Sequence, residues 1–117
     1  MSYTYTDQTL KEFALQYFYH FSKKELDGVV DLFDDSIMLE DWENKAYTKE
    51  DVIAVYQKIF DSVNSISVTP MKIFADGGVV IAQLLIRING VENIYVVDII
   101  HYDTETGKIK SIQAFKG

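Results

Sequence analysis

The chain has 117 residues, 48% of them hydrophobic, with a net charge of −7, two histidines and no cysteine. This length predicts one domain, residues 1–117, around a single core, and the negative charge argues against nucleic acid or an anionic membrane as a partner. The absence of cysteine excludes a disulfide, and the two histidines lie too far apart in the sequence to suggest a metal site. Since no apolar run could span a bilayer either, we expect a cytoplasmic protein.

The first predicted helix runs from Thr6 or Thr9 to about Ser22, because apolar residues recur at helical spacing through this stretch. Thr9 and Glu12 have the spacing of a capping box, which would satisfy free amides of the first turn. Tyr17 lies within the apolar stripe. A tyrosine at such a position usually fills the core with its hydroxyl hydrogen-bonded. The helical pattern alone therefore does not show whether Tyr17 only packs in the core or also takes part in chemistry.

Two further helices are expected before residue 65. The second is short, from Glu25 to Phe33, with Phe33 on its inward face. The third follows Thr48, whose hydroxyl can cap the first turn, and its apolar face includes Tyr56. Acidic residues in its first turn favour this start because they interact well with the helix dipole.

Between these helices, a turn at residues 34–36 leads into a strand predicted over residues 36–42. Alternation along the strand places Ile37, Leu39 and Asp41 on one face. A carboxylate on an apolar face needs a partner or a chemical role, because burying an unpaired charge is costly. The alternative is that the strand leaves the core by residue 41, so that Asp41 begins a solvated loop.

From residue 65 the pattern becomes extended and predicts a four-stranded antiparallel meander. Asn89-Gly90 is a strong signal for a tight hairpin, and Pro70 predicts a bulge, bend or edge in the first strand. Val79–Ile88 is a nearly continuous apolar strand, which predicts that both of its faces are covered, so we expect a homodimer in which a second copy covers one of them. The four strands are predicted over residues 65–75, 79–88, 91–102 and 108–115.

A second carboxylate stands on an apolar strand face in the latter half of the chain. Alternation groups Val96, Asp98 and Ile100 on one side of the strand, and no cation is near in sequence. We therefore expect Asp98 to be buried and protonated, as a hydrogen-bond donor. The alternative is an ion pair with a distant Lys or Arg, or a position facing solvent at a sheet edge.

Together the elements predict an α+β fold of one domain. Three N-terminal helices would pack on one face of a curved, mostly antiparallel sheet. Such a sheet and helix layer form a cone, and a small-molecule pocket is expected at its open end.

Several stretches resemble one known family, the steroid Δ5-3-ketosteroid isomerases. These enzymes belong to the nuclear transport factor 2-like superfamily, which has a cystatin-like cone fold, and the resemblance covers nearly the whole chain. The rarest part of the match is the combination of Tyr17, Asp41 and Asp98. The matching stretches are Leu26-Asp27-Gly28, Leu32-Phe33, Glu40-Asp41, Val97-Asp98-Ile99-Ile100 and Gly107-Lys108-Ile109.

The resemblance implies an isomerase that works through an enolate and needs no metal or organic cofactor. Asp41 falls on the general base of the family, and Tyr17 and Asp98 fall on its two oxyanion donors. Tyr56 falls on a tyrosine that in some members supports the catalytic one. The expected ligand is a small hydrophobic carbonyl compound.

The expected pocket also contains two departures from the family. Trp42 stands where most members have proline, and its loop would help to exclude water. Lys116 stands at the mouth, where one member carries tryptophan, and a cation there favours a smaller or more acidic ligand than a neutral steroid. The predicted pocket residues are Tyr56, Phe33, Trp42, Val96, Ile100, Ile112, Ala114 and Lys116.

Two other functions are compatible with the same residues. A polyketide cyclase of the SnoaL type shares the fold and an acid/base aspartate, and would be distinguished by its polyaromatic ester ligand. A non-catalytic module for small-molecule binding or dimerisation would fill the pocket with its own side chains, or would point Tyr17 and Asp98 apart.

Overall fold

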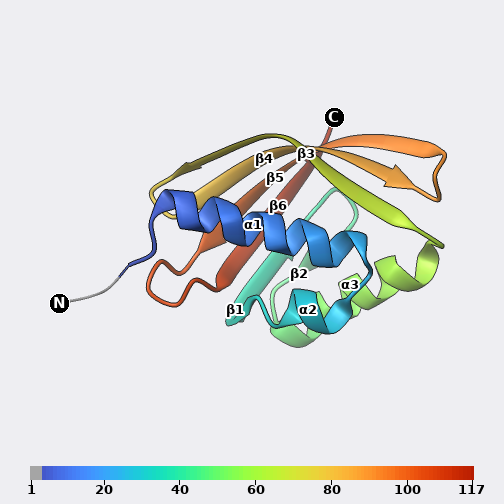
Figure 1. Cartoon of the computed structure of the whole chain (residues 1–117). Coiled ribbons are helices and arrows are strands. Elements are labelled where there is room, and N and C mark those ends of the chain that lie inside the picture. The colour runs from blue at the N-terminus through green and yellow to red at the C-terminus, as the bar shows by residue number, and fades with distance from the viewer. Residues whose placement is uncertain (1–3) are drawn as a thin grey trace.

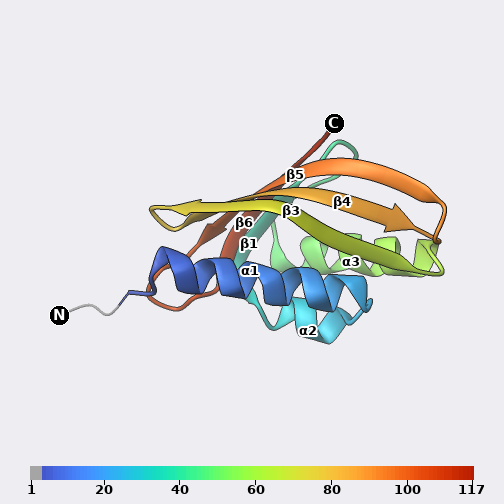
Figure 2. The same cartoon turned by 45° about the horizontal axis from the view of Figure 1, so that its top comes forward.

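The computed structural model describes residues 4–117, which form three helices and a six-stranded sheet (Figure 1). All three helices lie on one face of the sheet, which curves over them (Figure 2). None of the helices in residues 4–117 is long and apolar enough to cross a membrane. The helices are α1 (Asp7–Ser22), α2 (Leu26–Val30) and α3 (Lys49–Ser62); the strands are β1 (Phe33–Glu40), β2 (Lys45–Ala46), β3 (Ile66–Asp76), β4 (Val79–Ile88), β5 (Glu92–Tyr102) and β6 (Ile109–Lys116).

The strand order of the sheet is β2-β1-β6-β5-β4-β3. Strands β3 to β6 form the predicted antiparallel meander. Strand β1 lies beside β6 and runs parallel to it, whereas the short strand β2 pairs with β1 at the edge. The predicted α+β architecture with a curved, mostly antiparallel sheet is therefore confirmed, and the β1–β6 pair joins the two halves of the chain.

Helix α1 begins at the first of its two predicted starts, and helix α2 ends earlier than predicted. Thr6 is the N-cap of α1, since its hydroxyl accepts a hydrogen bond from the Thr9 backbone amide at 3.2 Å. The predicted capping box at Thr9 is therefore wrong. Helix α2 ends at Val30, because Phe33 already pairs with Ile109 of β6 and belongs to β1.

Strand β1 begins earlier than predicted and contains the predicted turn as a bulge. Its register with β6 shifts between Phe33 and Met38. Inside this irregular part, the Asp34 carboxylate accepts hydrogen bonds from the Ser36 hydroxyl at 2.6 Å and the Ser36 amide at 2.9 Å. Both hydrogen bonds lower the pKa of Asp34, and the bond from the Ser36 hydroxyl has the larger effect. Beyond the bulge Ile37 points into the core, as alternation predicts.

The long hairpins follow their sequence signals closely. The β3–β4 register shifts between Pro70 and Lys72, which confirms the bulge predicted at the proline. Asn89 and Gly90 both adopt left-handed backbone angles, with φ of 54° and 72°. This is the conformation that a tight hairpin with the right twist requires at both central positions.

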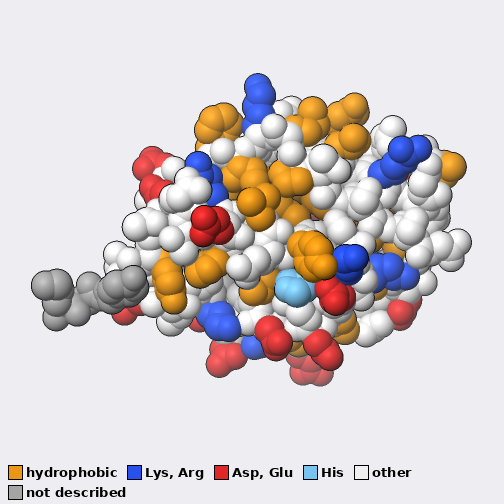
Figure 3. All heavy atoms as spheres, in the orientation of Figure 1, with side chains coloured by type: hydrophobic (Ala, Val, Ile, Leu, Met, Phe, Trp, Pro, Cys, Tyr) orange, Lys and Arg blue, Asp and Glu red, His pale blue; other side chains and the backbone are white. Residues whose placement is uncertain are grey.

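Strand β4 is covered on one face only within this chain. Val80, Ala82 and Leu84 are buried beneath the helices, whereas Ile81 on the other face is 42% exposed. Other large apolar side chains of the outer sheet face are exposed too, including Phe74 and Tyr95. On the face shown in Figure 3, hydrophobic side chains are spread over the upper and central parts of the molecule, and a group of acidic side chains lies along its lower, helical edge.

Two glycines with the same backbone angle allow a test of how tightly α1 packs against the β5–β6 turn. Gly107 and Gly90 have φ of 73° and 72°. A Cβ at Gly107 would lie 2.7 Å from the Phe13 ring, whereas one at Gly90 would meet nothing within 4 Å. We expect Gly90→Ala to lose about 1 kcal/mol of unfolding free energy from backbone strain. Gly107→Ala should lose a further ~1–3 kcal/mol from overpacking.

Urea denaturation of the two variants and the wild type would measure this difference. Equal losses in the two variants would show that α1 does not press on this turn.

Candidate active site

A cavity of about 340 Å³ opens between the sheet and the helices α1 and α3. Its wall is mostly aliphatic and aromatic, and carboxylates enter it from the loop after β1 and from β5. Nine of the predicted site residues line this cavity: Tyr17, Asp41, Trp42, Tyr56, Val96, Asp98, Ile112, Ala114 and Lys116.

Tyr17 and Tyr56 face each other across the helix layer. Each lies on the inward stripe of its helix, α1 or α3, and their hydroxyl oxygens are 2.5 Å apart. Both side chains are buried, and the ring of Phe21 packs edge-on against Tyr56 at 5.9 Å between centroids. Burial raises the pKa of both hydroxyls, so both stay protonated at neutral pH and can donate hydrogen bonds.

Asp98 lies in the middle of β5 and is 7% exposed. Its neighbours across the sheet are Ala82 on β4 and Ala114 on β6, two small residues that leave room around the carboxyl group. Burial raises the pKa of Asp98 to about 7, with a further contribution from the negative charge of Asp41. The alternatives of an ion pair or a solvent-facing position are wrong, since no described residue forms an ion pair with Asp98.

Asp41 begins a loop after β1 and also places its carboxylate in the cavity. The strand ends at Glu40, and the Asp41 backbone amide turns to donate to the Asn44 carbonyl at 2.9 Å. Its carboxylate nevertheless lines the cavity. The oxygen Oδ1 accepts from the amides of Glu43 and Asn44 at 2.8 and 2.6 Å, whereas Oδ2 has only a long contact of 3.3 Å to the Asn44 side chain. The turn thus holds the carboxylate while leaving one oxygen nearly free.

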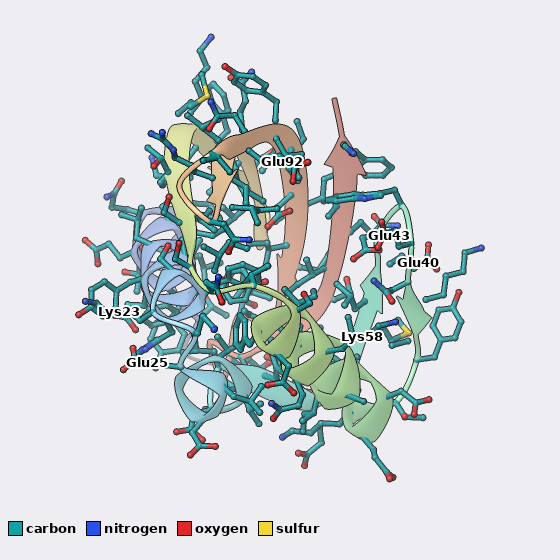
Figure 4. All side chains as sticks on the ribbon, turned by 90° about the vertical axis from the view of Figure 1, so that its right-hand side faces the viewer. Lys23, Glu25, Glu40, Glu43, Lys58 and Glu92 are labelled. Atoms are coloured by element: carbon teal, nitrogen blue, oxygen red, sulfur yellow. The ribbon has the colours of Figure 1, made fainter. Side chains whose placement is uncertain are left out.

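The mouth of the cavity carries a cation over an aromatic ring. The ammonium of Lys116 lies 5.9 Å from the centroid of the Trp42 ring, within the range of a cation–π contact. Glu43 and Glu92 lie on either side of the C-terminal half of β6 in Figure 4, and both line the cavity.

The structure does not bring every predicted pocket residue to the cavity. Phe33 and Ile100 lie in the core, 3% and 0% exposed, and neither lines the wall. The Phe33 ring packs behind Tyr56, at 5.4 Å between centroids. Ile100 is the next inward-pointing residue of β5 after Asp98, on the side away from the mouth. It lies opposite Ile112, where core side chains close the cone. Alternation gives the face of a strand, but not the depth at which a pocket ends.

Sequence reasoning missed Asn44, which donates to Asp41 through both its backbone and its side chain. The spacing of Asp41 and Asn44 is the available signal, because an Asp side chain often accepts from amides two and three residues later. Glu43 and Glu92 at the rim were missed as well, since charged loop residues carry no pattern that points inward.

The arrangement can move a proton next to a carbonyl group. One carboxylate with a nearly free oxygen and two groups able to donate hydrogen bonds line the same largely apolar cavity. In such a cavity, donors aimed at a developing negative charge act strongly because little water competes with them. Among residues 4–117 no three His, Asp or Glu side chains are placed to hold a metal ion.

Comparison with known proteins points to one family. The model of the SnoaL-like domain matches residues 14–112. No curated protein matches the chain. Solved structures of low identity share its fold, so they inform the architecture and not the activity.

Three of these structures illustrate the range of proteins that share this fold. The epoxide hydrolase/cyclase-like enzyme SalBIII, which has a role in pyran ring formation in salinomycin, superposes with a TM-score of 0.81 at 21% identity, covering 94% of this chain and 92% of its own. A candidate SnoaL-like polyketide cyclase from Shewanella denitrificans gives 0.81 at 13% identity, covering 93% and 90%. A candidate ketosteroid isomerase from Kribbella flavida gives 0.79 at 15% identity, covering 100% and 82%.

The buried carboxyl group predicts a specific pH dependence of stability. Because the pKa of Asp98 is raised on folding, the folded state keeps a proton that the unfolded state releases between pH ~4 and ~7, so this group makes stability fall as pH rises through that window. Asp98→Asn, which imitates the protonated form, should remove this loss. We expect the variant to exceed the wild type by about 4 kcal/mol at pH 8 and by little at pH 4.

Urea denaturation at the two pH values measures both differences. A gap that does not change between pH 4 and pH 8 would mean that Asp98 titrates normally in the folded protein.

Proposed function

Because the chain belongs to the SnoaL-like domain family, we propose that it binds a small hydrophobic carbonyl compound and shifts a double bond in it through an enolate. The observation that carries this proposal is the shared cavity of Tyr17, Asp41 and Asp98. The expectation that Tyr17 and Asp98 belong to one site, and do not point apart, is thus supported by their placement.

Asp41 acts as the base in this proposal. Its Oδ2 takes a proton from the carbon next to the carbonyl group, and the electron pair of that C–H bond moves to form the enolate. Asp41 then returns the same proton to a different carbon, so that the double bond moves and no atom is gained or lost. The hydrogen bonds from Glu43 and Asn44 to Oδ1 fix the carboxylate for both steps.

Tyr17 and protonated Asp98 stabilise the oxyanion of the enolate. For Tyr17 to donate to the ligand, the short hydrogen bond between the two tyrosines must run from Tyr56 to Tyr17. Tyr56 then supports the donor through this hydrogen bond. Asp98 donates only while it holds its proton, so activity requires pH below or near its pKa of about 7.

A second candidate is the cyclisation of a polyketide, favoured by the fold shared with a cyclase-like enzyme and a candidate cyclase. The same base and donors would serve, since ring closure onto a carbonyl group also passes through an enolate. The two reactions differ in ligand, a polyaromatic ester for the cyclase and an enone for the isomerase.

Isomerisation of 5-androstene-3,17-dione, followed by the ultraviolet absorbance of the conjugated product, tests the proposal. We expect turnover by the wild type that falls as pH rises through about 7, as Asp98 loses its proton. Asp41→Asn should lower kcat by at least about 10³-fold, because the variant has no base. Asp35→Asn is the matched control, since the Asp35 side chain is fully exposed and pairs only with Lys49 on the surface.

Turnover that survives in Asp41→Asn would refute the assignment of the base. If the wild type binds carbonyl compounds but exchanges none of their α-hydrogens with deuterated water, a non-catalytic binding module is the better description.

We also propose a homodimer that uses the outer face of the sheet. Phe74, Ile81 and Ile99 form one row across β3, β4 and β5, and Val97 and Phe115 form part of the next. Such a contiguous apolar face is unusual on a monomer and typical of an interface between copies.

Light scattering at micromolar concentration should give twice the mass of one chain. Ile81→Lys, which places a charge in the middle of the face, should give a single-chain mass because an unpaired charge is costly to bury. Val91→Lys is the control, since Val91 is 82% exposed at the tip of the β4–β5 hairpin. A single-chain mass for the wild type would contradict the dimer.

A further inference from the structure

Lys116 is the only basic residue on the wall of the described cavity. The other charged residues there are the carboxylates Asp41, Glu43, Glu92 and Asp98. The two aspartates belong to the proposed chemistry, and the two glutamates are exposed at the rim. A single cation at the mouth therefore needs an explanation of its own.

Lys116 has no carboxylate partner in the described part of the chain. The two ion pairs there join His20 to Glu25 and Lys49 to Asp35, both away from the cavity. Instead, the ammonium of Lys116 lies over the Trp42 ring. A contact of this kind contributes about 0.5–1 kcal/mol at an exposed site, and it leaves the three N–H donors of the ammonium free for an anion.

The sheet register places Lys116 in line with the proposed oxyanion donor. Asp98 lies opposite Ala114 and Val96 lies opposite Lys116, so Lys116 is one inward position closer to the mouth. Two residues of a strand span about 7 Å. A ligand with its carbonyl oxygen at Asp98 thus extends toward the ammonium over a spacer of a few carbon atoms.

We infer that the ligand is a keto acid, with its carbonyl group at Tyr17 and Asp98 and its carboxylate on the ammonium of Lys116. The identity of the carbonyl end rests on the proposed function. Charge then fixes the orientation of the ligand, because its carboxylate is repelled by Asp41 and attracted by Lys116 at the mouth. Neutral analogues of the same shape lack this second anchor.

The competing role for Lys116 is to offset the charges of Glu43 and Glu92. Both glutamates are exposed, where water and salt already screen their charges. The ammonium also lies over Trp42 and not within ion-pair distance of either glutamate. This role predicts that Lys116 has no preference between an acid and its ester.

Trp42 is the single tryptophan of the chain, and it lines the mouth beside Lys116. Its fluorescence therefore reports binding at this place, and calorimetry checks the dissociation constants. The probes are 4-(2-oxocyclohexyl)butanoate and its methyl ester, which differ in charge and share the ketone. The variants are Lys116→Gln, Lys116→Arg and, as a control with the same loss of charge on an exposed position of the same strand, Lys110→Gln.

We expect the wild type to bind the acid at least tenfold more tightly than the ester. Lys116→Gln should abolish this preference, whereas Lys116→Arg and Lys110→Gln should keep it. Equal affinity of the wild type for both probes, a preference that survives in Lys116→Gln, or binding of neither probe would each overturn the inference.

Deuterium exchange at the carbon atoms beside the ketone, followed by NMR, separates this inference from the proposed function. Exchange that depends on Asp41 without any acid preference would overturn the keto acid and leave the enolate chemistry standing. An acid preference that depends on Lys116 without exchange would support the contact with the carboxylate and remove the proposed reaction.

Discussion

The burial of one carboxyl group, that of Asp98, is the constraint around which this fold is arranged. An ionised carboxylate at a buried position is costly, so the group keeps its proton up to a pKa of about 7. The flanking Ala82 and Ala114 give it room instead of packing against it. A core built only for stability would place an aliphatic side chain there. The free-energy cost of burying a carboxyl group therefore indicates that the cavity is a functional site.

The helix layer complements this strand by presenting hydroxyl groups within an otherwise apolar aromatic cluster. Tyr17 and Tyr56 share one hydrogen bond, so each hydroxyl has a partner and the accepting hydroxyl keeps its own proton to donate to a ligand. The rings of Phe21 and Phe33 pack against Tyr56 and fix the tyrosine pair between α1, α3 and β1. The polar groups of the cavity are therefore held by packing, which costs no reorganisation when a ligand arrives.

Local patterns predicted much of this arrangement. The helical stripe placed Tyr17 inward, alternation placed Asp98 inward, and the Asn89-Gly90 signal set the β4–β5 hairpin. The start of β1 was missed because Asp34 and Ser36 do form a local turn, but long-range pairing with β6 holds that turn inside a strand. The depth of the pocket could not be predicted either, because it depends on which side chains from distant elements meet at one level, as at Ile100.

The parallel pairing of β1 with β6 has a consequence for how the site comes into being. Apart from the two residues of β2, strand β1 has no sheet neighbour until β6 has been made and has docked between β1 and β5. Strands β3 to β5 are joined by local hairpins, which form quickly, so these strands and α1 can meet before that. During synthesis, Tyr17 and Asp98 can therefore reach their folded positions early, whereas Asp41 reaches its position last. The cavity acquires its base only as the sheet closes.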